Sequence, residues 1–403
     1  MFAKTPVSTQ NLNVTRLWNP YFIMIMVVNF GANVSFYLIS SILSTYSIQL
    51  GASQALSGII VGCFSIVALV ARPFSGVISN RGRSSSLLVF SFLGMAFAAL
   101  GYAFAPRPIL FLPIRVLHGI AFSINGVVTM VLVSKVLPEA VLTKGMAYFG
   151  VSQVLAAAVG PTVGSACGQA FGYRYSFIVA AATLIVFCIV VFVLPIPQVK
   201  ASAAVEKKRV SLNELLDVRL IRLVAFSALF SAFNGLCSSY MVNIGAVRGI
   251  DQISLYFTVN SASIILVRFL CGRLADKIKS IHYIMLCTLL TACLGCVIIG
   301  AANALWLFFI GAFIQAFSHG FAQPAVQAES LKQADPSRLG TSSSTFFISA
   351  DLGQGLGVMI GGAVAGVAGY DGMFYVMAVI FLLAIPLYAL VNMGARKKVS
   401  KTA

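Results

Sequence analysis

Long apolar stretches, separated by short polar connections, fill almost the whole chain. Twelve of them are long enough for a helix to cross a bilayer, at about 20 residues per crossing. We expect six in the first half and six in the second, over residues 20–46, 54–79, 85–105, 108–134, 145–170, 174–197, 220–247, 252–275, 281–302, 304–328, 340–367 and 372–394. The pattern therefore predicts an all-α polytopic membrane protein with two six-helix bundles.

The composition supports this interpretation. Apolar residues make up 59% of the 403 positions and charged residues only 9%, and the mean hydropathy is +0.96. A water-soluble domain of this length has too little interior to bury so much apolar surface. The protein is therefore expected to use the bilayer as its solvent.

The basic residues are distributed unevenly between the two predicted sides of the membrane. Of the 27 Lys and Arg, three lie in the loops of one side and three inside predicted helices; they are Arg107, Arg174 and Arg248, and Arg72, Arg115 and Arg268. The remaining 21 lie in the tails and the loops of the other side. By the positive-inside rule, both termini are predicted to be cytoplasmic.

The formal net charge of +17 does not indicate nucleic-acid binding, because no compact basic domain carries it. The charge is expected to face anionic lipid instead. We expect a cytoplasmic N-terminal tail (1–19), an N-terminal bundle (20–197), a cytoplasmic linker (198–219), a C-terminal bundle (220–394) and a cytoplasmic C-terminal tail (395–403).

The two halves repeat each other. The segment from Arg72 to Arg81 aligns with the segment from Arg268 to Lys277 at an offset of 196 residues. The Gly160–Gly164 segment aligns with Gly357–Gly361 at an offset of 197, and His118-Gly119 with His319-Gly320 at 201. Three matches in the same order, at nearly one offset, indicate a duplicated six-helix unit whose copies are related by an axis along the membrane normal.

Four short motifs make the chain resemble a known family. They are Gly76-Val-Ile-Ser-Asn80-Arg81-Gly82-Arg83, its second-half copy Gly272-Arg-Leu-Ala-Asp276-Lys277, Arg115-Val-Leu-His-Gly119, and Gly160-Pro161-Thr-Val-Gly164. With these motifs the chain resembles the major facilitator superfamily over its whole length, and most closely its twelve-helix drug:proton antiporters. The resemblance implies transport by alternating access and assigns gating roles to the following residues: Gly76, Asn80, Arg81, Arg83, Gly119, Gly160, Pro161, Gly164, Gly272 and Asp276.

The first of these motifs departs from the family at one position. The family carries an acidic residue where this chain has Asn80, and an acid there favours the N-terminus of a facing helix through the helix dipole. We therefore expect this first-half contact to depend on a weaker, neutral hydrogen bond. The alternative is that both motif loops serve membrane topology alone.

Charges inside the predicted spans are the strongest functional signal. Each costs about 2.5–3.5 kcal/mol at a helix centre, so Arg115 and Asp351 should face a partner or a wet cavity. The first half has no acidic residue inside any predicted span. We hypothesise that Arg115 is a substrate anchor or its electrostatic gate, with either Asp351 or a negative group on the substrate as partner. The alternative is a structural pair without a transport role.

Asp351 is also the first candidate for proton coupling, because burial favours the protonated form of a carboxyl group. A structural polar pair remains the alternative for it. His118 and His319 are further candidates, although a lone membrane histidine is more often a hydrogen-bonded packing residue. Glu329 completes the set, with a role as a charge at the edge of a loop as its alternative.

A set of polar side chains on the spans that line the cavity in the superfamily is expected to contact the substrate together with Arg115. They are Asn29, Asn33, Tyr37, Asn125, Gln153, Asn234, Tyr240, Asn260, Gln323 and Gln354. The eight cysteines lie in or beside apolar stretches and are expected to pack there, since no four converging ligands suggest a metal site.

The sequence thus predicts a multi-pass transporter of the cell membrane that exports a small amphipathic or anionic organic solute in exchange for protons. The rival is a proton-coupled importer of an organic acid, a sugar or another small nutrient. A receptor would need a sizeable soluble domain, which the chain does not offer. Neither a nucleotide-binding motif nor a convergent nucleophile and base is visible, so we expect no cofactor and no enzymatic activity, and a monomer whose partners are substrate, protons and lipid.

Overall fold

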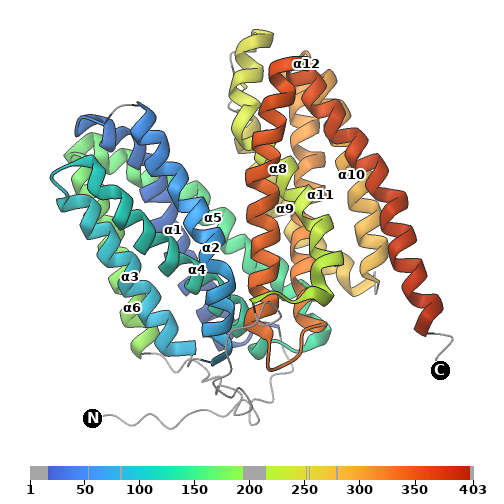
Figure 1. Ribbon diagram of the computed structural model, residues 1–403, viewed down its shortest axis with the longest axis horizontal. Coiled ribbons are helices and arrows are strands. Elements are labelled where there is room, and N and C mark those ends of the chain that lie inside the picture. Colours follow the sequence, from blue (N-terminus) through green and yellow to red (C-terminus); the bar gives the residue numbers. More distant parts are fainter. Residues whose placement is uncertain are drawn as a thin grey trace. The chain divides into compact units, whose positions relative to one another are not determined.

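The computed structural model describes residues 17–52, 54–81, 84–193, 215–250, 252–253, 255–277 and 280–399. Long α-helices dominate this part of the chain (Figure 1), and it contains no β-strand. The all-α prediction is therefore confirmed for the described residues. Apolar side chains all round a helix, with few charges, are what a bilayer requires, since a helix satisfies its own backbone groups.

The described part of the first half contains six long helices. They are α1 (Pro20–Gln49), α2 (Gln54–Arg81), α3 (Ser84–Phe104), α4 (Phe111–Val136), α5 (Glu139–Phe171) and α6 (Tyr173–Val193), with a short 3-10 turn, η2 (Pro108–Leu110), before α4. Helix α1 has a well-defined start, because the side chain of Asn19 accepts the backbone N–H of Phe22 and Pro20 occupies the first helical position. Helix α5 begins at Glu139, earlier than predicted. The apolar pattern missed this start because Glu139, Thr143 and Lys144 interrupt it.

The described part of the second half contains a 3-10 turn, η3 (Val218–Leu220), followed by five long helices. They are α8 (Ile221–Arg248), α9 (Leu255–Lys277), α10 (Ile281–Ala301), α11 (Leu305–Lys332) and α12 (Leu339–Val399). Helix α12 includes both of the last two predicted spans, and its one non-helical residue is Gly369, at φ 71°.

Gly369 has a counterpart in the first half. Gly172, which lies 197 positions earlier, separates α5 from α6 and has φ 95°. A positive φ is strained for residues with a side chain, so glycine suits both corners. Each corner joins two long helices through one residue.

Ten segments of the described chain are long and apolar enough to cross a membrane, and Leu255–Cys271 of α9 forms a shorter apolar helix. One of the ten runs from Leu339 to Leu390 and includes the corner at Gly369. The polytopic character of the protein is therefore confirmed. The count of twelve crossings and the cytoplasmic position of both termini stay predictions.

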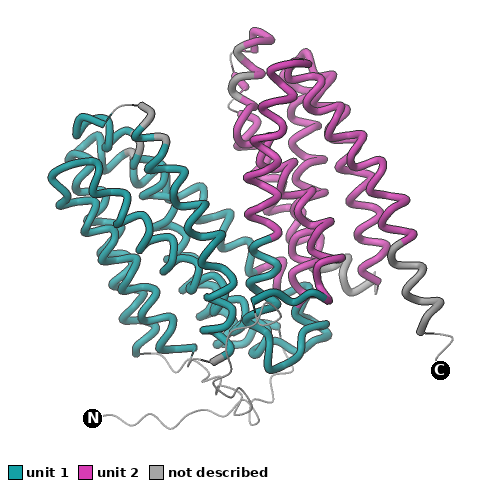
Figure 2. Tube along the Cα trace, viewed as in Figure 1, with its two compact units in different colours: residues 1–145, 149–218, 331–348 teal, residues 146–148, 219–330, 349–403 magenta. Residues whose placement is uncertain are grey.

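The chain divides into two compact units (Figure 2). Unit 1 comprises residues 1–145, 149–218 and 331–348, and unit 2 comprises residues 146–148, 219–330 and 349–403. Helix α12 therefore begins in unit 1 and continues in unit 2. The domain boundaries that the sequence suggested stay predictions.

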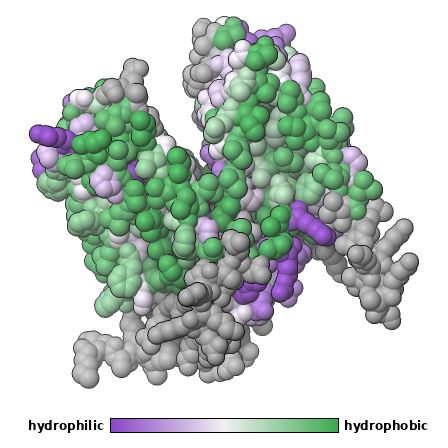
Figure 3. Space-filling model, in the orientation of Figure 1, coloured by the Kyte–Doolittle hydropathy of each residue, from purple (hydrophilic) through white to green (hydrophobic). Residues whose placement is uncertain are grey.

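Apolar side chains cover most of the visible face of each unit (Figure 3). Phe192 of α6 is 74% exposed and Leu390 of α12 is 73% exposed. Large apolar side chains with this exposure are unfavourable in water and suit contact with lipid tails.

Candidate functional site

Arg115 of α4 lies in the interior of unit 1. Its side chain is only 2% exposed, and its guanidinium carbon lies 4.6 Å from the centre of the Phe64 ring on α2. One terminal nitrogen approaches Nδ1 of His118 at 3.5 Å, while the buried Nε donates to none of the described residues. None of the described carboxylates pairs with it, and its neighbours are the Phe64 ring, the His118 imidazole and Tyr102.

His118 lies one helical turn after Arg115, inside a cluster of aromatic rings. Its ring centre is 5.3 Å from that of Phe64, 6.1 Å from that of Tyr102 and 6.4 Å from that of Phe36. The next residue, Gly119, lets α4 approach α2, since a Cβ there would lie 2.9 Å from a methyl group of Val67. Arg115 and His118, predicted separately for substrate and protons, therefore occupy one dry cluster.

The energetic balance at Arg115 is unusual. A guanidinium over an aromatic ring gains about 2 kcal/mol when desolvated, whereas an uncompensated buried charge costs several kcal/mol. The nearby ring and imidazole therefore leave a net positive potential inside unit 1. In a medium of low dielectric this potential extends further than it would in water.

The asparagines predicted to contact the substrate in unit 1 form hydrogen bonds within it. Asn29 donates to the Ser152 hydroxyl at 2.7 Å, which ties α1 to α5, and Asn33 donates to the backbone and side-chain oxygens of Asn29. Asn125 donates to Ser91 Oγ at 3.2 Å, which ties α4 to α3. All three asparagines are buried. Tyr37 is half-buried on α1.

A chain of amides crosses unit 2. Gln315 of α11 donates to Asn234 Oδ1 on α8 at 3.2 Å and accepts a hydrogen bond from Asn260 on α9. Gln315 is fully buried, and in lipid its amide has no water to replace these partners. The sequence prediction included Gln323 of α11 but omitted Gln315, because an amide in an apolar run signals a buried polar contact without showing which helices it joins.

The remaining candidates of unit 2 lie on three helices, α8, α11 and α12. Tyr240 of α8 donates its hydroxyl to the carbonyl of Val358 at 2.9 Å. Gln354 is exposed on α12, whereas Asp351 and Glu329 are half-buried on α12 and α11. His319 of α11 lies in the unit with its Nδ1 atom buried and no hydrogen bond from that atom to a described residue.

Glycines hold one helix close to another at the same place in each half. A Cβ on Gly160 of α5 would lie 2.8 Å from the Val34 carbonyl of α1. A Cβ on Gly357 of α12, 197 positions later, would lie 2.7 Å from Cα of Ala232 on α8. Only glycine fits such close crossings. The contact between α5 and α1 recurs between α12 and α8, so the two halves repeat each other in helix packing as well as in sequence.

Asn80, near the end of α2, contacts the start of α12 within unit 1. Its side-chain oxygen accepts the backbone N–H of Gly340 at 2.7 Å, and its amide nitrogen donates to Thr341 Oγ1 at 2.8 Å. The first N–H groups of a helix have no partner inside the helix, so Asn80 caps α12 with a neutral side chain. Gly76 and Gly340 let the two helices touch, since a Cβ on Gly76 would lie 2.8 Å from the Gly340 carbonyl.

Three further contacts strengthen this Asn80 cap. The carboxylate of Asp217 accepts the hydroxyl of Ser342 at 2.8 Å, and the Asp217 N–H donates to Thr345. Arg72 of α2 is buried with its guanidinium carbon 4.3 Å from the centre of the Phe347 ring. Residues 339–348 of α12 are thus bound to unit 1 by polar and cation–π contacts along several turns.

Some of the predicted gating residues fall at the edge of the described chain. Arg81 ends α2, and both Gly272 and Asp276 belong to α9. The structure does not describe the side chains of Arg81 and Asp276 or the surroundings of Gly272. Arg83 lies wholly outside the described residues. Pro161 lies inside α5 beside the Gly160 crossing.

Comparison with known proteins gives a consistent result. A family model described as Major Facilitator Superfamily matches residues 25–282 and 248–403. The uncharacterized MFS-type transporter MJ1560 of Methanocaldococcus jannaschii is 21% identical over 88% of this chain and 94% of its own length. The uncharacterized MFS-type transporter YbcL of Bacillus subtilis is 21% identical over 59% of this chain and 60% of its own.

Two solved structures share the fold. The human organic anion transporter MFSD10 (TETRAN) superposes with a TM-score of 0.75 at 17% identity, over 92% of this chain and 100% of its own. The Major Facilitator Superfamily transporter FucP, solved in the outward conformation, superposes with a TM-score of 0.75 at 14% identity, over 93% of this chain and 99% of its own. At these identities the likeness shows the fold alone.

Proposed function

The chain belongs to the Major Facilitator Superfamily, and from this premise we propose that it exports a small amphipathic or anionic organic solute in exchange for protons. Transport by alternating access suits a chain of two compact units whose sequence is duplicated. Multi-pass membrane proteins of this family are secondary transporters, so no bound nucleotide is needed.

The observation that carries the anionic part of the proposal is the burial of Arg115. A guanidinium that is 2% exposed, over the ring of Phe64 and without a described carboxylate beside it, is a fixed positive charge in a dry bundle. Such a charge attracts an anion through the low-dielectric interior without touching it. Arg115 therefore acts as the electrostatic gate rather than as a direct ligand of the substrate.

The Asn80 cap supplies the moving contact of the proposed cycle. Two neutral hydrogen bonds hold the first turn of α12 to α2, and neutral bonds are weaker than charge-assisted ones. A transporter that must break this contact in every cycle benefits from a weak cap. The glycine crossings of α5 and α12 provide close, smooth surfaces along which helices shift by small amounts.

Proton coupling is assigned to Asp351, with His118 as the second group. Asp351 is half-buried within α12, and it is a carboxyl group inside a membrane-spanning segment. His118 adjoins Arg115 at 3.5 Å, so its protonation and the electrostatics of the anion gate affect each other. This adjacency links the protonation state of His118 to the potential that the anion meets near Arg115.

The proposal is tested in proteoliposomes that contain the purified protein and a pH-sensitive dye. A panel of aromatic and aliphatic carboxylates is added on one side, and both solute and proton fluxes are recorded. We expect a carboxylate gradient to drive protons in the opposite direction. The variant Arg115→Met, of similar volume but uncharged, should reduce carboxylate flux by about tenfold or more, because it removes the only charge of the cluster.

Arg107→Met is the matched control, since Arg107 is exposed beside η2 and is not part of the aromatic cluster. Its fluxes should equal those of the unmodified protein. Protons that move in the same direction as the solute would identify a symporter and overturn the export part. Carboxylate transport that is equal in Arg115→Met and the unmodified protein would overturn the anionic part.

A further inference from the structure

One end of unit 2 holds a pocket of about 520 Å³ between α8 and α12. Pockets that bind small molecules have volumes of about 300–1,000 Å³. Its polar side chains are Arg248, Asp371, Tyr240 and Tyr370. None of the predicted gating or proton-coupling residues lines it, although Tyr240, which was predicted to contact the substrate, forms part of its wall.

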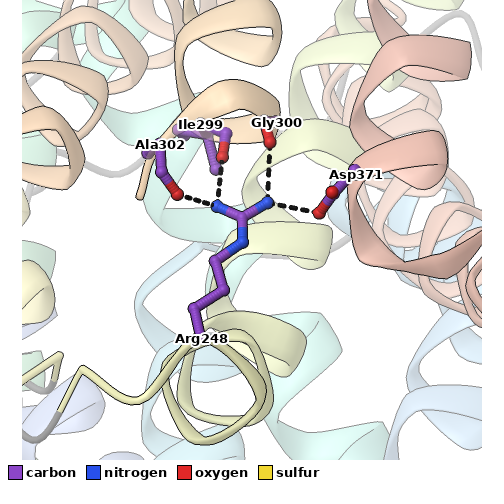
Figure 4. Close-up of polar contacts among 5 residues, drawn as sticks. All are labelled: Arg248, Ile299, Gly300, Ala302 and Asp371. Carbon is purple, nitrogen blue, oxygen red and sulfur yellow. Dashed lines mark hydrogen bonds and ion pairs between the residues drawn. The ribbon is translucent and has the colours of Figure 1, made fainter. Parts of the chain in front are cut away.

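The guanidinium of Arg248 has little capacity left for a ligand (Figure 4). One terminal nitrogen donates to the carbonyls of Ile299 and Ala302, and the other donates to the carbonyl of Gly300 at 2.6 Å and to Asp371. These three carbonyls end helix α10, where the negative end of the helix dipole favours a cation. Because each terminal nitrogen carries two N–H groups, all four are used, and an anionic ligand would find no terminal donor.

The carboxylate of Asp371, unlike the guanidinium of Arg248, still has capacity to accept hydrogen bonds from a ligand. Its Oδ1 atom accepts from Arg248 at 2.5 Å, while the side chain is 64% exposed. An ionised carboxylate has about four lone-pair positions on its two oxygens. One contact with Arg248 thus leaves free acceptor positions on Asp371, which lines the pocket. The carbonyls of α10 already neutralise part of the charge of Arg248.

Two tyrosine rings complete the pocket. The ring centres of Tyr240 and Tyr370 lie 6.0 Å apart, with the rings tilted by 42°. The hydroxyl of Tyr240 is anchored to Val358 at 2.9 Å, which fixes its ring. Gly362, Gly366 and Gly369 of α12 line the wall, and their lack of side chains leaves room beside the rings. Aromatic faces beside a carboxylate are the surroundings that an organic cation prefers.

We propose that this pocket, named here the Asp371 pocket, binds a protonated amine that carries an apolar or aromatic group. Asp371 receives the ammonium group and the two tyrosine rings pack against its substituent. The ammonium group is offered by a free amine in solution and by the ethanolamine headgroup of a lipid.

The test uses the full-length protein in nanodiscs of phosphatidylglycerol, titrated with phenethylamine by calorimetry at neutral pH. We expect saturable binding, and no binding of phenylacetate, which has the opposite charge. Asp371→Asn should weaken phenethylamine binding by about fivefold, and Tyr370→Leu by about threefold. Asp335→Asn is the matched control, because Asp335 is an exposed carboxylate in unit 1, and it should bind as the unmodified protein does.

A second titration, in nanodiscs with phosphatidylethanolamine added, separates the two sources. Weaker phenethylamine binding there shows that the lipid headgroup occupies the Asp371 pocket, and unchanged binding shows that the pocket takes free amines. The proposal is overturned if phenethylamine binds equally to the unmodified protein, Asp371→Asn and Tyr370→Leu, if phenylacetate binds as well as phenethylamine, or if phenethylamine does not bind in either disc. Unfolding temperatures of the variants show whether each has folded.

Discussion

The Asn80 cap permits a quantitative prediction. Asn80→Ala removes the acceptor of the Gly340 N–H and the donor to Thr341, which are 2.7 and 2.8 Å from their partners. Loss of a helix cap costs about 0.5–2 kcal/mol, and loss of a second, partly buried hydrogen bond costs about 0.5–1.5 kcal/mol. The start of α12 should therefore be less stable on α2 by about 1–3 kcal/mol, which multiplies the open population by about 5–150.

Hydrogen–deuterium exchange with mass spectrometry measures this population directly. Amide groups in the first turns of α12 exchange only when they open, so peptides that cover residues 339–348 should exchange about 5–150 times faster in Asn80→Ala. Asn80→Asp should act in the opposite direction. A carboxylate at a helix N-terminus gains about 0.3–1 kcal/mol from the helix dipole, which slows exchange by about two- to fivefold.

Asn19→Ala is the matched control. Asn19 also caps a helix through its side-chain oxygen and donates its amide to a second helix, at Val136, but it contacts α1 and α4 instead of α12. Its loss should leave exchange in residues 339–348 unchanged. The reasoning fails if Asn80→Ala changes exchange there by less than about twofold, or if Asn19→Ala raises it equally.

Three further predictions concern packing, buried amides and charge. Gly357→Ala should lower the unfolding temperature because its Cβ would meet the backbone of α8, at a cost of about 1–3 kcal/mol. Gly355→Ala, with open space at that position, should leave the unfolding temperature unchanged or raise it slightly. Equal losses in the two variants would contradict the close crossing. Gln315→Leu should destabilise unit 2 by about 1–3 kcal/mol, because Asn234 and Asn260 each lose a hydrogen bond. Thermal unfolding in detergent measures this, and an unchanged temperature would show that the amide chain is not formed. Arg248→Gln should also lower the unfolding temperature, by the loss of a charged cap on α10 worth about 1–2 kcal/mol, and a neutral outcome would refute the capping role.

The apolar pattern predicted the helices well because lipid imposes a single requirement along the whole length of a span. A run of apolar residues long enough to cross the bilayer has to be helical, so position and type of element follow from composition alone. The ends were less accurate, as Glu139 at the start of α5 shows, because a helix continues beyond the membrane wherever its polar residues permit.

The side-chain partners were much harder to predict. The resemblance indicated that residue 80 would face the start of a helix, but a three-dimensional contact between positions 260 residues apart cannot be read from one sequence. Arg115 was expected to need a carboxylate or water, and the structure gives it a phenylalanine ring and an imidazole instead. Gln315 was missed because an isolated amide in an apolar run carries no sign of which helices it joins.

The glycine corners at Gly172 and Gly369 have a consequence for how the protein is made. Each joins two long helices through a single residue with positive φ, so almost no polar segment is available to remain outside while one helix settles alone in the bilayer. We expect each pair to enter the membrane together, as a preformed hairpin, during synthesis. An epitope inserted at either corner would separate the arms and stall that step, whereas the same insertion near Arg107, in the connection before α4, should be tolerated.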